Sequence, residues 1–200
     1  MVELIMRNTN FVVLAVNHNP SILTKDWILK NKIVDDNVVN FVHTPPFSNV
    51  ETENFQIIVD SDRLQISLKS GRVTENNLKE LPKIVERYVK QLPETPYKAL
   101  GLNFIYEIGE NSSKLKEIFC PDEKKFKKIF SEKYNVGGYV KFKIEGYMVT
   151  LKIIPESESK SIADFNFNKE VKSVKDLLKK ANDYGKFLGK SKKVIERLFE

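Results

Sequence analysis

Two stretches of alternating apolar and polar residues, each with a turn near its middle, constrain the fold of this chain more than any other feature. They are FQIIVDSDRLQISLKSG at 55–71 and VKFKIEGYMVTLKI at 140–153. A period of two places every second side chain on one face of a β-strand, and the polar residues between the alternating runs are typical of hairpin turns. We therefore expect a hairpin in each half of the chain, with one apolar and one polar face.

The elements around these hairpins recur in the same order. In the first half, strands at 10–17 and 37–43 precede the hairpin, a short helical segment lies between them, and an amphipathic helix follows from Thr74. In the second half, a strand at 97–108, a helical segment, the hairpin, a strand near 161–168 and a helix from about Val171 to the end follow one another. The proline-containing LPETP at 92–96 separates the halves. We expect an α+β fold of two β-α-β-β-β-α repeats, 1–92 and 93–200, that pack as one globular unit with a shared core.

The two halves also share short similarities, NFVVLAV with NFIYEI and IIVDSDRLQISLK with FKIEGYMVTLKII. This order of elements resembles the tandem-repeat fold of the TATA-box-binding proteins. The resemblance covers most of the chain, and it implies a curved, mainly antiparallel sheet with long helices on one face. The glycine-containing strand signature of that family has no counterpart here, so no functional residue is carried over and a true TATA-box-binding protein is not expected.

The composition is that of a folded globular protein, with 41 % hydrophobic and 30 % charged residues. No apolar run reaches the length of a membrane span, and the first residues do not form a secretory signal, so we expect no membrane partner and a cytoplasmic location. The single cysteine agrees with a reducing compartment. The first 92 residues carry equal numbers of acidic and basic side chains, so the net charge of +6 lies entirely in the second half.

The expected C-terminal helix would carry this charge on a narrow stripe. Seven of its basic residues are spaced three, four or seven apart, which confines these seven to an arc of roughly 60°. They are Lys172, Lys175, Lys179, Lys186, Lys190, Lys193 and Arg197. Such a stripe is either a solvated surface or a contact for an acidic protein or for nucleic-acid phosphates. In the same helix, Ala181, Gly185 and Gly189 recur every four residues, which favours close packing inside the chain or a helix–helix dimer contact.

Two of the expected strands, at 10–17 and 97–108, are apolar on both faces. A sheet with helices on one side only should not leave apolar residues on its other side, so we expect a partner subunit, a ligand or the segment HTPPFSNVE at 43–51 to cover that face. The sequence favours a homodimer, and the residues predicted to form its interface are Val12, Leu14, Val16, Leu102, Phe104 and Tyr106. Polar hairpin residues would surround this apolar centre.

Residues typical of catalytic and metal sites are scarce. The chain has two histidines and one cysteine, and its glycines match no phosphate-binding loop, so we predict no metal, no cofactor and no catalytic residue. His43 is the histidine best placed for a function, and Cys120 fits a buried thiol better than a nucleophile. We therefore expect a non-catalytic binding or assembly protein that dimerises through apolar sheet or helix surfaces. The alternatives are a charge-driven nucleic-acid-binding protein that uses the basic helix, and an enzyme of unrecognised type.

Overall fold

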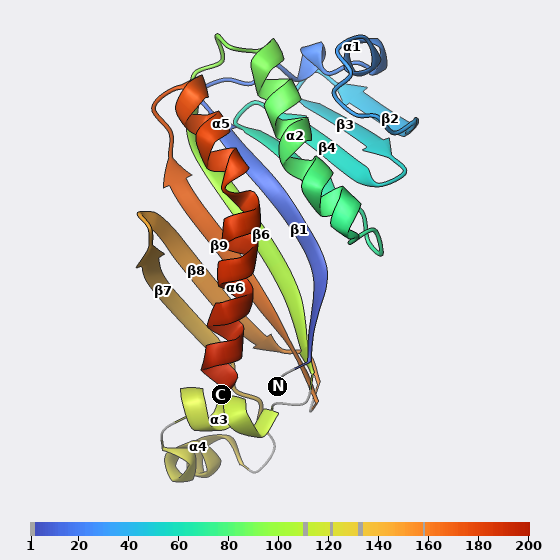
Figure 1. The fold of residues 1–200 in the computed structure, drawn as a ribbon. Helices are drawn as coiled ribbons and strands as arrows, with labels where there is room; N and C mark the ends of the chain where they lie inside the picture. The colour runs from blue at the N-terminus through green and yellow to red at the C-terminus, as the bar shows by residue number, and fades with distance from the viewer. Residues whose placement is uncertain (1–2, 110–111, 121, 132–133, 158) are drawn as a thin grey trace.

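The fold is built on one antiparallel sheet of nine strands in the order β2-β3-β4-β5-β1-β6-β9-β8-β7 (Figure 1). The computed structural model describes residues 3–109, 112–120, 122–131, 134–157 and 159–200. Strands β1 and β6, the first of each half, lie side by side at the centre of the sheet and curve along their length (Figure 1). The expectation of an α+β fold with a mainly antiparallel sheet is confirmed.

The strands are β1 (Leu4–Ala15), β2 (Val38–Thr44), β3 (Phe47–Thr52), β4 (Phe55–Asp60), β5 (Arg63–Leu68), β6 (Tyr97–Gly109), β7 (Gly138–Ile144), β8 (Tyr147–Pro155) and β9 (Lys160–Glu170). The helices are η1 (Pro20–Ile22), α1 (Lys25–Lys30), α2 (Glu75–Gln91), α3 (Ser112–Phe119), α4 (Glu123–Phe130), α5 (Val174–Asn182) and α6 (Tyr184–Phe199). None of the described helices is both long enough and apolar enough to cross a membrane.

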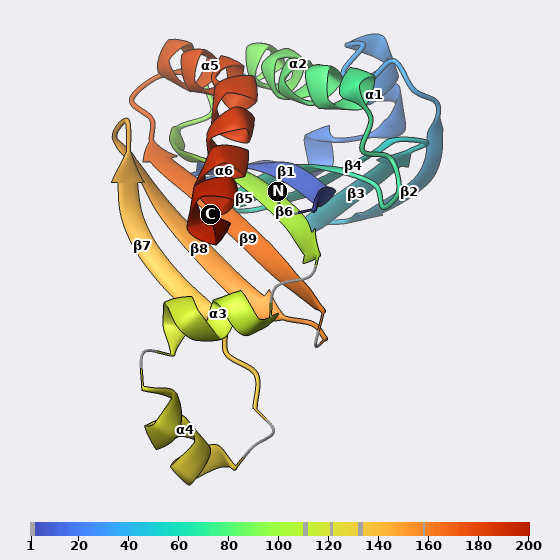
Figure 2. The same ribbon diagram turned by 60° about the horizontal axis from the view of Figure 1, so that its bottom comes forward.

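The main hydrophobic core lies between the sheet and the helices α2, α5 and α6, which cross one of its faces (Figures 1 and 2). Alternate residues of the central strands point into this core. Phe11 and Val13 of β1 and Leu102 and Phe104 of β6 are completely buried in it. Among the described residues, no helix lies over the opposite face of the central strands, and we call it the open face (Figure 2).

Strand β3 was not expected, because the segment 43–51 was interpreted as a loop that could cover the sheet. Pro45 and Pro46 instead form the turn of a hairpin that joins β2 to β3. Every second residue of β3, beginning with Ser48, is buried, so this strand has the same two-faced pattern as its neighbour β4. The first half therefore contributes five strands to the sheet and the second half four.

The expectation of one continuous C-terminal helix is wrong. The chain forms α5 and α6, which meet at Asp183, whose backbone angles are φ −74° and ψ −1°. Figure 1 shows the two helices following one another with a change of direction. Ser173 caps α5, since its side chain accepts a hydrogen bond from the Asp176 N–H.

Helix α2 begins where the sequence predicted. The Thr74 side chain accepts a hydrogen bond from the Asn77 N–H, as expected for an N-cap residue. Pro82 lies inside the helix, which continues without interruption to Gln91. Leu81 on the apolar face of α2 is completely buried in the hydrophobic core.

Candidate binding face of the sheet

The antiparallel pairing of the strands decides which side chains become neighbours on the open face. In β1, Asn10 and Val12 point to this face, opposite in direction to the buried Phe11 and Val13. In β6, Asn103 is the direct partner of Asn10, and Gly101 is the partner of Val12. Directly paired side chains on one face lie about 5 Å apart, close enough for hydrogen bonds.

One polar residue from every strand lies in a single row across the open face. Following the pairing from one edge to the other, the row is Asn40, Glu51, Gln56, Ser67, Asn10, Asn103, Asn166, Thr150 and Lys141. We call this set the polar row. Because none of its members is apolar, the centre of the open face offers hydrogen-bonding groups along the whole width of the sheet.

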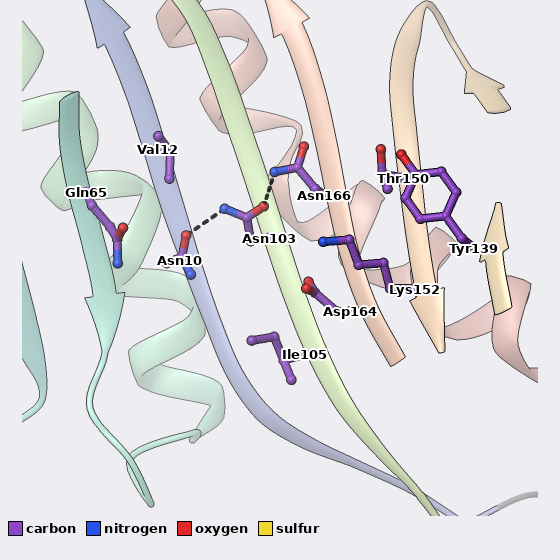
Figure 3. Close-up of a pocket in the computed structure, with 10 residues that line it drawn as sticks. All are labelled: Asn10, Val12, Gln65, Asn103, Ile105, Tyr139, Thr150, Lys152, Asp164 and Asn166. Carbon is purple, nitrogen blue, oxygen red and sulfur yellow. Dashed lines mark hydrogen bonds between the residues drawn. The ribbon is translucent and has the colours of Figure 1, made fainter. Parts of the chain in front are cut away.

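Three asparagines at the centre of the polar row bond to one another. Nδ2 of Asn103 donates to Oδ1 of Asn10, and Nδ2 of Asn166 donates to Oδ1 of Asn103, both at 2.7 Å (Figure 3). These bonds fix the orientation of all three amides. Within the described part of the chain, Nδ2 of Asn10 and Oδ1 of Asn166 have no partner. The amide nitrogen of Asn10 and the amide oxygen of Asn166 are therefore available to a ligand.

Two shallow hollows lie on this face, and Asn10 and Gln65 line both of them. The larger, with a volume of about 430 Å³, contains the three asparagines (Figure 3). Its other lining residues are Val12, Gln65, Ile105, Tyr139, Thr150, Lys152 and Asp164. The second, of about 300 Å³, lies over the first half of the chain and includes Asn8, Gln56 and Ser67. Together they form a surface depression that follows the polar row.

Charge is distributed unevenly along this depression. In the first half, Lys69 lies 3.4 Å from Glu51, and Arg63 lies 3.1 Å from Asp60, so these cations are paired. In the second half, Lys141 and Lys143 on β7 point to the open face and have no ion pair among the described residues. This end of the face is therefore electropositive.

Lys152 on β8 and Tyr139 on β7 complete this electropositive end. They are direct partners in the strand register, and the Tyr139 ring is 61 % exposed (Figure 3). Asp164 lies beside Lys152 across β8 and β9. Burial raises the pKa of the Asp164 carboxyl, and the charge of Lys152 acts in the opposite sense. We call Tyr139, Lys141, Lys143 and Lys152 the basic corner.

The predicted apolar interface is corrected by the structure. Leu102, Phe104 and Tyr106 lie on the helix-covered face and are completely buried, so they cannot contact a partner from the open face. The sequence placed them beside Val12 and Leu14 because it gave no pairing register between β1 and β6. Val12 and Leu14 do point to the open face, where they are partly buried, and Val16, just beyond β1, is 55 % exposed.

The predicted basic stripe of the C-terminal helix is interrupted. The break at Asp183 separates Lys175 and Lys179 on α5 from the remaining members on α6, and Lys172 precedes α5. On α6, Lys186 and Lys190 both form ion pairs with Glu145 in the β7–β8 turn. Among the described residues, Lys193 and Arg197 have no ion pair. The stripe therefore presents separate cations and not one continuous surface.

The four-residue spacing of Ala181, Gly185 and Gly189 does not reflect the close packing inside the chain that it suggested. Ala181 is buried on α5, whereas the two glycines lie on α6, beyond the break. A Cβ atom added to either glycine would meet no atom within 4 Å. Close backbone packing inside the chain therefore does not account for these glycines.

The hydrogen bonds and the burial of the two histidines and the cysteine indicate roles in the packing of the fold. Nδ1 of His43 lies 2.7 Å from Oγ of Ser48, which donates to the Pro20 carbonyl and is completely buried, so this serine cannot reach a substrate. His18 is buried, with Nε2 3.1 Å from the Val13 carbonyl oxygen, and burial lowers its pKa. Cys120 is a buried free thiol. No cluster of potential metal ligands is found in the part of the chain that the structure describes.

Comparison of the sequence with known protein families and with curated proteins found no match. The function of this chain is therefore inferred from the chemistry of its surfaces. The asparagines of the polar row were not among the residues that the sequence singled out. In the sequence, each of these central strands has an asparagine at an outward-facing position. This pattern can be recognised only when the strand register is known, because the register aligns Asn10 with Asn103 and Asn166.

Proposed function

We propose that this protein is a non-catalytic binding protein that holds a single-stranded nucleic acid on the open face of its sheet. The observation that carries this proposal is the polar row with the basic corner at one end. Unpaired lysines beside an exposed tyrosine match the electrostatic and stacking contacts by which proteins hold single strands. The row of oriented amides adds hydrogen-bonding groups as a third kind of contact.

Each kind of contact has a candidate group. The free donor of Asn10 and the free acceptor of Asn166 can bond to base edges, since asparagine pairs with donor and acceptor groups of nucleobases. The exposed ring of Tyr139 provides a surface for base stacking. Lys141 and Lys143 can neutralise phosphates and release their counterions. The open face therefore supports this proposal better than the interrupted stripe on α5 and α6.

The strand order supports an internal repeat as part of the same proposal. In each half the first strand is central, the last strand lies beside it, and the half ends in helices that cover the same face (Figure 1). We propose 1–92 and 93–200 as these repeats, which also agrees with the resemblance to the TATA-box-binding protein fold. A cytoplasmic location belongs to the proposal too, and the free thiol of Cys120 supports a reducing compartment.

The proposal is tested by fluorescence anisotropy with a labelled oligothymidylate at low and at physiological salt. If three lysines contact phosphates, affinity should fall by about 20-fold between roughly 50 and 200 mM salt. Lys141→Ala/Lys143→Ala should weaken binding and reduce the salt dependence. The matched control is Lys175→Ala/Lys179→Ala, which removes two exposed lysines from α5.

The two double variants distinguish binding at the open face from binding at the helices. Loss of binding in the α5 variant alone would assign the site to the basic helix and reject the open face. Absence of binding at low salt, or an affinity that does not change with salt, would reject nucleic acid as the ligand. Circular dichroism of both variants establishes that they remain folded.

A further inference from the structure

In the described part of the chain the sheet ends at two edge strands, β2 and β7, and these edges differ in how they are protected. Edge strands expose unpaired backbone groups, and proteins usually prevent their association with charged side chains or bulges. The edge strand β7 carries Lys141 and Lys143. The edge strand β2, with the sequence VVNFVHT, carries no charged residue, and Val42 on it is 45 % exposed.

The β2–β3 hairpin determines which backbone groups of β2 are free. Thr44 and Phe47 are the paired residues that close its two-residue turn. In such hairpins the closing residues bond to each other, and the direction of the backbone groups alternates along the strand. The N–H and C=O groups of Phe41 and His43 therefore point outward from the sheet. The register shift next to Val39 limits the regular edge to residues 40–44.

We infer that a second copy of this chain pairs with β2 in antiparallel orientation, about a two-fold axis at Val42. In this arrangement Phe41 of each copy exchanges backbone hydrogen bonds with His43 of the other. Val42 of each copy faces its equivalent as a non-hydrogen-bonded pair, and both exposed valines become covered. The pairing joins two sheets edge to edge and leaves both open faces on the same side.

Charge favours a second copy as the occupant of this edge. A two-fold axis brings identical strands together, so any charged residue near the axis would meet its own equivalent. The regular edge of β2 contains no such residue, whereas equivalent pairing of β7 would place its lysines close to one another. The inference does not rest on the nucleic-acid proposal, because the edge and the open face are different surfaces.

An engineered disulfide tests this geometry. In a non-hydrogen-bonded antiparallel pair the Cα atoms are about 4.5 Å apart, which lies within the range that a disulfide spans. Val42→Cys in a Cys120→Ala background should form a covalent dimer under mild oxidation, and Cys120→Ala removes the natural thiol. The control is Ile154→Cys in the same background, because Ile154 is 53 % exposed but lies on the inner strand β8.

Sedimentation of the unmodified protein gives the second measurement. We expect the unmodified protein to sediment as a dimer. In Val42→Lys the dissociation constant of this dimer should increase strongly, because the change places two like charges at the two-fold axis. A monomer up to high micromolar concentration would overturn the inference, as would a dimer without crosslinking at Val42. Equal crosslinking of Ile154→Cys, or assemblies larger than a dimer, would also overturn it.

Discussion

Asn103 on β6 donates a hydrogen bond to Asn10 on β1 across the line where the two halves of the chain meet. The same two strands are connected on the other face. The hydroxyl of Thr9 donates to the Asn103 carbonyl at 2.7 Å, and the Tyr184 hydroxyl of α6 lies 2.9 Å from Thr9. Hydrogen bonds therefore connect Tyr184 of α6 through Thr9 to the backbone of Asn103, whose side chain bonds to its neighbours on the open face. The backbone of Asn103 is therefore tied to the helical layer.

Asn103→Ala should reduce the affinity for oligothymidylate about tenfold, because it removes both bonds that orient Asn10 and Asn166. Asn168→Ala is the control, since Asn168 lies on the same face of β9 but pairs with Gly101, outside the polar row. Anisotropy titrations at one salt concentration compare the two variants. Equal affinities for both would show that the polar row has no role in binding.

Gly138→Ala should destabilise the protein by about 1–3 kcal/mol, because a side chain there would overlap the Phe119 ring of α3. Gly185→Ala is the matched control. It adds the same methyl group to a helix where no atom lies within 4 Å, so it should stabilise by up to about 1 kcal/mol. Urea unfolding measures both changes. A stabilising Gly138→Ala would contradict the described packing of α3 against β7.

The local elements of this fold could be predicted from the sequence because their signals are local. Alternating residues predicted the hairpin of β4 and β5, and the helix after Thr74 was recognised by its N-cap and its apolar spacing. Strand β3 was missed because Pro45 and Pro46 suggested a loop. These prolines form the hairpin turn, and the small buried residues Ser48 and Thr52 gave a weak strand pattern.

The binding face could not be predicted because it depends on register between distant strands. Asn10, Asn103 and Asn166 are far apart in the chain, and no local pattern aligns them. The helix break had a different cause. Asp183 continues the helical spacing of charged and apolar residues, so periodicity alone did not reveal that α6 packs as a separate helix.

Acid should destabilise the protein through His18, whose pKa is lowered by burial. A histidine with a lowered pKa binds fewer protons in the folded state, so its contribution is fully present above the unfolded pKa of about 6.5 and is lost as the pH falls below that value. We expect the urea midpoint to fall between pH 7 and pH 5. In His18→Gln, which cannot titrate, the midpoint should fall less over the same interval. An equal pH dependence of both proteins would exclude His18 as the cause.

Thr9→Val should destabilise the protein by about 1–3 kcal/mol, because it leaves the buried Tyr184 hydroxyl and the Asn103 carbonyl without this partner. Tyr184→Phe should cost less, since Thr9 keeps its bond to the Asn103 carbonyl. The double variant has no unpaired hydroxyl buried in α6, so the combined loss should be smaller than the sum of the single losses. Urea unfolding of all four proteins gives the coupling energy. Additive losses would show that Thr9 and Tyr184 do not interact, and the proposed connection between α6 and the central asparagines would then fail.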